Sequence, residues 1–137
     1  MSNKIVLENM IGFVRKYLTA IARYRTLSQE EIVADETIRG AVERYLYLMA
    51  QSTIDLAEAV VAYKRLRKPT TLSETFYVLD ENNVIPHDLS ERLVKMVGFR
   101  NVIAHDYVKV NYDILYDVLT KRYRDIEEFV EIIETTL

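Results

Sequence analysis

Arg100, Asn101, His105 and Tyr107 are the residues of this chain whose types and spacing could together perform chemistry. An imidazole titrates near neutral pH, so His105 could accept or donate the proton that moves when an RNA 2′-hydroxyl attacks the adjacent phosphate. The forked cation of Arg100 could bind the phosphate oxygens as negative charge builds on them. Asn101 could orient the imidazole or hold a phosphate oxygen, and the phenol of Tyr107 could bond to the substrate or, if exposed, accept a modifying group.

The residue types also indicate whether the chemistry needs a metal ion and whether the motif could have a purely structural role. No arrangement of Asp, Glu and His in the sequence has convincing spacing for metal ligands, so this chemistry requires no metal ion and no other cofactor. Taken alone, however, an arginine and a histidine five residues apart are more commonly a helix cap and a surface ion pair. The pair by itself therefore leaves both catalysis and a structural role open.

Arg100 and His105 must reach the same place in order to act together. Five residues turn a straight α-helix by about 140°, which separates these two side chains, whereas Asn101 and His105 share a face. Either the helix ends near His105, so that the imidazole can turn back, or the two side chains meet through a second copy of the chain. Both arrangements predict a site at a helix end or at an interface.

The elements that must position these residues are predicted to be helices. The chain has 137 residues, of which 50% are hydrophobic, with three glycines and two prolines. This is the length of one domain, and it supplies few turn residues for a multi-stranded sheet. We therefore expect a single all-α domain over residues 1–137, an antiparallel up-down helical bundle of four main helices plus a short one.

Apolar residues at helical spacing indicate where the first two helices lie. The first covers residues 4–25. The second begins between Ser28, which forms a capping-box pattern with Glu31, and Asp35, which offers another start. It runs until Pro69 stops it, and its middle is apolar on most sides, which predicts burial by more than one neighbour.

The remaining helices lead to and from the motif. A short third helix covers residues 71–79. A fourth follows Pro86, where Asp88 and Glu91 form a second capping-box pattern, and this helix carries Arg100 and its neighbours. Asn111 can cap a fifth helix.

For most charged residues outside the motif, the sequence allows both a structural and a functional interpretation. Asp55 lies in the most apolar helix, so we expect it to face a polar interface or to pair with a cation, and a role in the site stays open. His87 is expected to be a solvated first-turn residue. Two basic clusters are either solvated helix ends or tracks for a phosphate backbone: Lys64, Arg65, Arg67 and Lys68, and Lys121, Arg122 and Arg124.

Composition also narrows the compartment and the partners. The absence of cysteine excludes disulfides and thiolate chemistry and fits a reducing interior. No stretch has the length and apolarity of a transmembrane helix, and the first residues lack the apolar core of a signal peptide. We therefore expect a soluble cytoplasmic protein that does not contact a membrane. A net charge of −3 gives no general attraction to nucleic acid, so RNA must be bound by local cationic patches.

The segment from Leu89 to Tyr112 resembles the HepT-like toxins of the HEPN superfamily. It contains Leu-x-x-Met-Val-Gly-Phe-Arg-Asn-x-x-x-His-Asp-Tyr, which matches the family's signature nearly throughout. The similarity weakens upstream to a helical pattern around residues 54–57. In the first 35 residues only amphipathicity is shared.

The resemblance implies a helical bundle that forms a two-fold homodimer with the two motifs facing each other. Arg100 and His105 of each chain would then make a composite, metal-independent endoribonuclease site that cuts RNA rather than DNA, with tRNA one candidate. The expected products are a 2′,3′-cyclic phosphate and a 5′-hydroxyl. The implied partner is a small nucleotidyltransferase antitoxin, similar to MntA, that silences the toxin by attaching AMP to Tyr107.

Two other functions fit the same residues. In the first, the chain is a non-catalytic helical module that docks a nucleotidyltransferase and presents Tyr107 to it. In the second, it is a structural helical dimer in which Arg100 and His105 contribute to stability rather than to activity.

Overall fold

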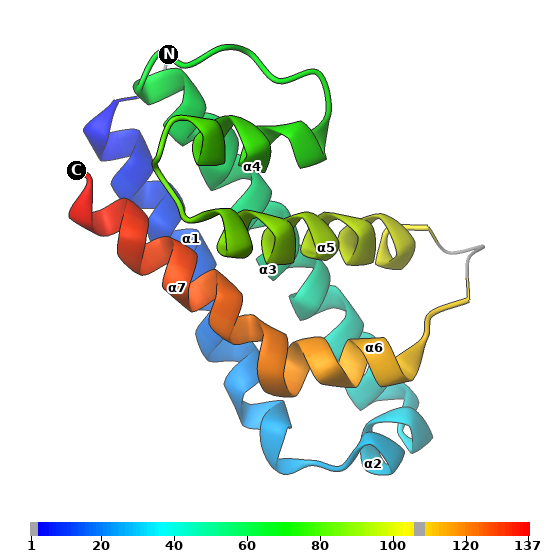
Figure 1. Cartoon of the computed structure of the whole chain (residues 1–137). Helices are drawn as coiled ribbons and strands as arrows, with labels where there is room; N and C mark the ends of the chain where they lie inside the picture. Colours follow the sequence, from blue (N-terminus) through cyan, green and yellow to red (C-terminus); the bar gives the residue numbers. More distant parts are fainter. Residues whose placement is uncertain (1–2, 106–108) are drawn as a thin grey trace.

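Helices make up most of the residues that the computed structural model describes, which are 3–105 and 109–137 (Figure 1). The α-helices are α1 (Lys4–Ala22), α2 (Gln29–Ala34), α3 (Glu36–Tyr63), α4 (Leu72–Glu81), α5 (His87–Ile103), α6 (Tyr112–Asp117) and α7 (Tyr123–Thr135). A 3₁₀ turn, η1 (Arg23–Thr26), follows α1, and a π-helical segment, η2 (Val118–Arg122), joins α6 to α7. The described residues form no β-strand, and the predicted all-α fold is confirmed.

The central helix is α3, which packs against α1, α2, α4 and α5. Its buried residues occur on several sides and include Leu46, Met49, Leu56 and Val60. This confirms the prediction that more than one neighbour buries this helix. In Figure 1, α5 crosses α3, and α7 lies along α1.

The chain uses both of the starts that the sequence offers between residues 28 and 35. Ser28 accepts a hydrogen bond from the Glu31 N–H, and Glu31 accepts one from the Ser28 N–H, which completes the predicted capping box of α2. Asp35 then caps α3 by accepting from the N–H groups of Thr37 and Ile38. A short additional helix, α2, therefore precedes the long one.

The end of α3 differs from the prediction that Pro69 stops this helix. The helix ends at Tyr63, because Arg65 adopts the left-handed conformation with φ 55°. The Leu66 N–H then donates to the Val61 carbonyl at 3.0 Å, the closing bond of a Schellman turn. The turn satisfies a terminal carbonyl of the helix well before the proline.

The predicted start of α5 after Pro86 is confirmed, but the capping of this helix differs from the prediction. The helix begins at His87, directly after Pro86, whose backbone has φ −68°. Proline fixes this angle and so favours a helix start. Asp88 is therefore inside the first turn and bonds to Arg92 at 3.1 Å instead of capping the helix, so the second predicted capping box is wrong.

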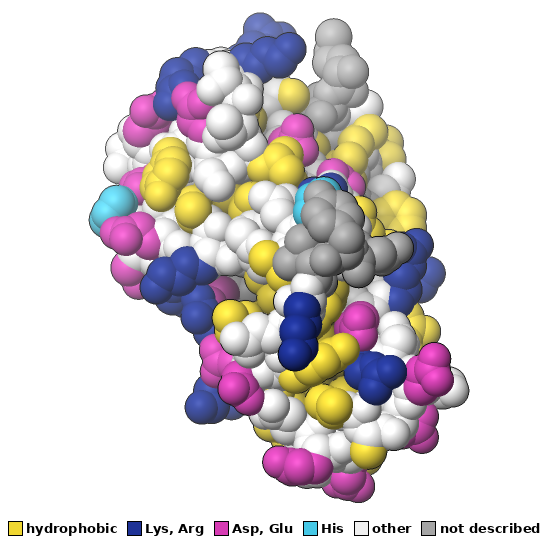
Figure 2. All heavy atoms as spheres, turned by 90° about the vertical axis from the view of Figure 1, so that its right-hand side faces the viewer, with side chains coloured by type: hydrophobic (Ala, Val, Ile, Leu, Met, Phe, Trp, Pro, Cys, Tyr) yellow, Lys and Arg dark blue, Asp and Glu magenta, His cyan; other side chains and the backbone are white. Residues whose placement is uncertain are grey.

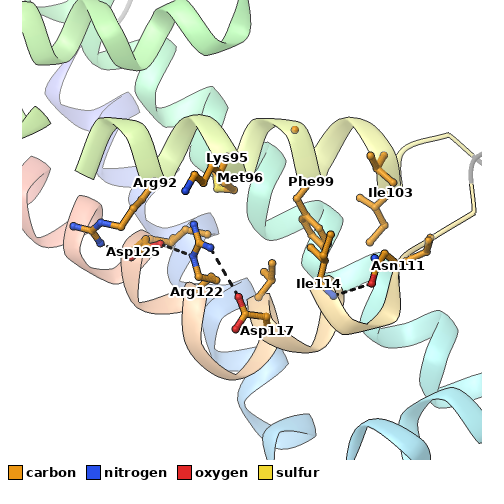
Figure 3. Close-up of a pocket in the computed structure, with 15 residues that line it drawn as sticks. Arg92, Lys95, Met96, Phe99, Ile103, Asn111, Ile114, Asp117, Arg122 and Asp125 are labelled. Carbon is orange, nitrogen blue, oxygen red and sulfur yellow. Dashed lines mark hydrogen bonds and ion pairs between the residues drawn. The ribbon is translucent and has the colours of Figure 1, made fainter. Parts of the chain in front are cut away.

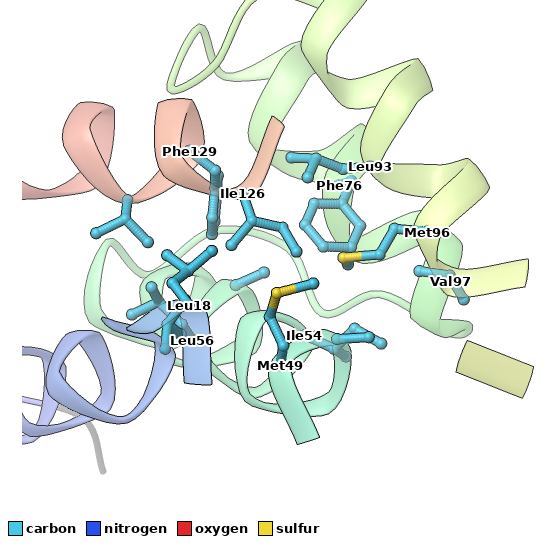
Figure 4. Packing of buried hydrophobic residues seen from close by; sticks show 14 of the residues in the cluster. Leu18, Met49, Ile54, Leu56, Phe76, Leu93, Met96, Val97, Ile126 and Phe129 are labelled. Carbon is cyan, nitrogen blue, oxygen red and sulfur yellow. The ribbon is translucent and has the colours of Figure 1, made fainter. Parts of the chain in front are cut away.

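The core joins α1, α3, α4, α5 and α7 through large apolar side chains (Figure 4). The rings of Phe76 in α4 and Phe129 in α7 meet edge to face with their centroids 5.8 Å apart. Met49 of α3 and Leu93 of α5 are also fully buried. Each such side chain contributes roughly 1.5–3 kcal/mol through its removal from water, so this core fixes how α5 lies across α3.

None of the described helices is both long and apolar enough to cross a membrane.

Candidate active site

Arg100 is positioned by the buried face of α5. Leu93, Met96, Val97 and Phe99 of this helix are all buried, so the helix is held against the core up to the residue before Arg100. Arg100 itself is half-buried, and its side chain extends to α3. The guanidinium is therefore anchored at a junction of two helices rather than free in solvent.

The main partner of Arg100 is Gln51 of α3. The Arg100 Nε–H donates to Gln51 Oε1 at 2.7 Å. The Gln51 side chain in turn donates from Nε2 to Asp55 Oδ1 at 2.8 Å, one helical turn further along α3. Asp55 is exposed, which fits the predicted polar surroundings, and it bonds to an amide rather than directly to a cation.

Two further contacts hold the guanidinium of Arg100. Its carbon atom Cζ lies 5.6 Å from the centre of the Tyr47 ring, within the range of a cation–π contact. Its Nη1 donates to Asn101 Oδ1 at 3.0 Å. The structure thus brings Arg100 and Asn101 together, and Asn101 in this arrangement holds the arginine.

The acidic residues Asp55 and Glu58 lie on α3 next to these contacts. Burial, and secondly the charge of Asp55, raise the pKa of Glu58 above its ordinary value. Two acidic side chains therefore occupy neighbouring turns of the helix that anchors Arg100.

His105 lies just beyond the end of α5. The last helical residue is Ile103, and Ala104 is the cap. The His105 N–H still donates to the Val102 carbonyl at 3.3 Å, which tightens the last turn. The prediction that the helix ends near His105 is confirmed. Tyr107, the remaining residue of the motif, lies outside the described residues.

A cleft of about 360 Å³ lies beside the motif, between α5 and the α6–η2 segment (Figure 3). Phe99 and Ile103 of α5 and Ile114 of α6 face one another across it. Val102 and Ile114 remain 39% and 52% exposed. The residues lining this cleft include neither Arg100 nor His105, so the apolar cleft and the candidate chemistry are neighbours rather than one site.

Ion pairs occupy several of the basic residues that could have attracted RNA. Arg67 of the first predicted basic cluster bonds to Glu74 and Glu81, and Arg122 of the second to Asp117 and Asp125. Figure 2 shows acidic, basic and hydrophobic side chains interspersed on the face where α5 ends. For these arginines the structural interpretation of the clusters is the better one.

The second histidine, His87, belongs to a separate cluster at the start of α5. Its Nδ1 lies 2.6 Å from Asp80 Oδ2 and its Nε2 lies 2.6 Å from Glu91 Oε1. The hydrogen bond with Asp80, followed by the charges of Asp80 and Glu91, raises the pKa of His87, and the same bond lowers the pKa of Asp80. His87 is exposed in the first turn, as predicted, and it ties the start of α5 to the end of α4.

The described residues hold no group of three or more His, Cys, Asp or Glu side chains placed to bind a metal ion. The polar groups around Arg100 are amides, a carboxylate and an aromatic ring, which are suited to holding a guanidinium. This arrangement presents the fixed guanidinium of Arg100 in the last turn of α5 and the imidazole of His105 just beyond the helix.

Comparison with known proteins identifies the family. A sequence model described as "Ribonuclease HepT-like" matches residues 14–133, which include Arg100 and His105. This chain belongs to the HepT-like ribonuclease family. The resemblance inferred from the motif is thereby confirmed.

Similar proteins support this membership. The HepT-like chain is 34% identical over 100 residues to the mRNA nuclease HepT of Shewanella oneidensis, which covers 73% of this chain and 75% of that protein. It is 21% identical over 103 residues to the tRNA nuclease HepT of Aphanizomenon flos-aquae, covering 75% and 70%. Among solved structures, it resembles the tri-AMPylated HEPN toxin of Shewanella oneidensis in complex with MNT antitoxin, with a TM-score of 0.86, 29% identity and coverage of 97% and 98%.

Sequence reasoning missed Gln51 and Tyr47 as parts of this HepT-like site. One signal was available for Gln51: it precedes Asp55 by four residues in the most apolar helix, and two polar side chains at that spacing share a face. No signal identified Tyr47, since a tyrosine at a helix edge is ordinary packing.

Proposed function

We propose that this HepT-like chain is the endoribonuclease toxin of a toxin–antitoxin pair and that it acts in the cytoplasm. The observation that carries the proposal is the fixed guanidinium of Arg100 at the end of α5, with His105 immediately beyond the helix, in a chain of the HepT-like family. A held cation and an exposed imidazole are the two groups that 2′-hydroxyl attack on a phosphate requires.

In the proposed reaction Arg100 and His105 divide two tasks. His105 accepts the 2′-hydroxyl proton as the oxygen attacks phosphorus, and the bond between phosphorus and the 5′ oxygen breaks. The 5′ oxygen takes a proton from water as it leaves, so the products are a 2′,3′-cyclic phosphate and a 5′-hydroxyl. Arg100 binds the phosphate oxygens as they gain charge, and Asn101 supports the arginine. The reaction is proposed to be metal-independent, because Arg100 supplies the positive charge at the phosphate and His105 supplies the base.

We further propose that two copies of the chain assemble with their motifs facing each other. Arg100 points toward α3, whereas His105 follows the end of α5, so a second copy gives each imidazole another guanidinium to work with. Exposed apolar side chains such as Val102, on the last turn of α5, are available for such contact. The dimer would form one composite site for a single RNA strand.

The proposed partner is a nucleotidyltransferase antitoxin that attaches AMP to Tyr107. The solved HEPN toxin similar to this chain is tri-AMPylated and bound to MNT antitoxin, which motivates the proposal. Added phosphate beside Arg100 and His105 would repel RNA and occupy the cation, which explains silencing in physical terms.

Growth on expression in a bacterial host tests this function. Wild-type protein is expected to arrest growth, while Arg100→Ala and His105→Ala relieve the arrest at equal protein levels. His87→Ala is the matched control, because it removes the other histidine, which lies in the Asp80–Glu91 cluster. His87→Ala should remain toxic. Equal toxicity of the wild type and His105→Ala would contradict the assignment, and a harmless wild type that still receives AMP would favour the non-catalytic docking module.

A further inference from the structure

We propose that Gln51 is a positioning residue for the reaction, which, backed by Asp55, holds Arg100 in the orientation that receives the phosphate. The inference rests on the proposed function, in which Arg100 binds phosphate oxygens. It concerns a residue 49 positions before Arg100 in sequence and on a different helix.

The amide of Gln51 can point in only one direction. A guanidinium can only donate hydrogen bonds and an ionised carboxylate can only accept them. The amide therefore turns its oxygen to Arg100 Nε at 2.7 Å and its nitrogen to Asp55 Oδ1 at 2.8 Å. Asp55 thus fixes the amide, and the amide fixes Arg100.

The remaining contacts of Arg100 leave one end of the guanidinium available. Gln51 uses Nε and Asn101 uses Nη1, while the Tyr47 ring lies 5.6 Å from Cζ. Among the hydrogen bonds that Arg100 makes to the described residues, none involves Nη2, so both of its N–H groups are available to a phosphate. A side chain fixed at Nε keeps this end aimed in one direction.

A glutamine suits this task better than a glutamate would. A carboxylate at position 51 would form a charge-assisted pair with Arg100 and compete with the phosphate for the guanidinium. The neutral amide accepts one hydrogen bond and leaves the positive charge of Arg100 available. The carboxylate of Asp55 reaches Arg100 only through the amide, one turn away.

The test replaces Gln51 by methionine, which keeps the length of the side chain but cannot accept this hydrogen bond. We expect single-turnover cleavage of RNA by Gln51→Met to slow by about tenfold to a hundredfold, the usual cost of a misplaced reacting group. The melting temperature should stay close to that of the wild type, because Gln51 is only half-buried. Gln29→Met is the matched control: Gln29 also donates its amide to an aspartate, Asp113, at 2.7 Å, but on α2. It should cleave at the wild-type rate.

A second readout does not depend on cleavage. In nitrogen-15 NMR spectra of arginine side chains, the Arg100 Nε–H should exchange slowly with water in the wild type and faster in Gln51→Met. If the wild type cuts no RNA, the proposed function fails, and this exchange rate alone decides the positioning role: equal exchange in the two proteins overturns it, and faster exchange in the variant supports it.

Two further variants show whether a slower rate arises from the lost hydrogen bond to Arg100 rather than from a change in folding. Asp55→Asn changes an exposed residue and lets the Gln51 amide turn over, so a smaller loss of rate than in Gln51→Met is expected. In the Arg100→Ala background, Gln51→Met should cost nothing more, because the two residues act as one unit. Cleavage by Gln51→Met within twofold of the wild type, or a full additional loss in the Arg100→Ala background, would overturn the inference.

Discussion

The guanidinium of Arg25 stacks on the ring of Tyr123, with Cζ 3.4 Å from the ring centre. The same side chain donates from Nε to the Leu119 carbonyl at 3.1 Å. Leu119 belongs to the π-helical segment η2, in which the wider turn shifts the normal pairing of carbonyls. Arg25 therefore ties the turn after α1 to the irregular part of the helix that follows the motif.

Arg25→Lys is predicted to destabilise the protein by about 1–2 kcal/mol, because lysine has no planar group to stack on Tyr123 while bonding to Leu119. Urea denaturation of the variant measures the change. Arg23→Lys is the control, since Arg23 is exposed and lies 6.0 Å from the nearest ring centre, that of Tyr24, and it should change stability by less than about 0.5 kcal/mol. Equal effects of the two changes would show that the stacked geometry contributes nothing.

Phe129→Ala is predicted to cost about 3–5 kcal/mol, because it removes a fully buried ring and its edge-to-face contact with Phe76. Phe13→Ala makes the same chemical change at a side chain that is 54% exposed and should cost less than about 1 kcal/mol. Denaturant titrations of both variants test the pair. A large loss in Phe13→Ala, or a small one in Phe129→Ala, would contradict the packing described for α4 and α7.

The parts of this structure that the sequence predicted are those set by local chemistry. The caps at Ser28 and Asp35 were visible because each of these side chains accepts from a backbone N–H no more than three residues away. The end of α5 near His105 was one of the two arrangements that the spacing of Arg100 and His105 left open, the other being a meeting through a second copy. The early end of α3 was not predictable, since arginine rarely adopts the left-handed conformation that Arg65 has.

The candidate site also has a part that the sequence predicted and a part that only the structure shows. Arg100, Asn101 and His105 stand close together in one motif, so their types and spacing could be recognised. The hydrogen bond between Gln51 and Arg100 joins two helices, and only the packing of α5 against α3 reveals it. The π-helical segment was missed because the apolar stripe of the last helix shows no interruption there.

The stability of the protein should depend on the charge of His87. Its pKa is raised in the folded state, so the contacts with Asp80 and Glu91 stabilise the fold fully below the unfolded value of about 6.5 and are lost as the pH rises through the folded pKa. His87→Asn should therefore lower the melting temperature at about pH 5.5 and have little effect at about pH 9. A melting-temperature difference that is the same at both pH values would contradict this prediction.

The central claim is that Arg100 and His105 form a metal-independent ribonuclease site. It is tested most directly by incubating purified protein with total tRNA and with a structured RNA in excess EDTA, alongside Arg100→Ala, His105→Ala and the control His87→Ala. We predict cleavage by the wild type and by His87→Ala that leaves 2′,3′-cyclic phosphate ends, none by His105→Ala, and only slow residual cleavage by Arg100→Ala. Intact RNA with folded wild type whose Tyr107 is unmodified by mass spectrometry, or cleavage that persists in His105→Ala, would contradict the claim.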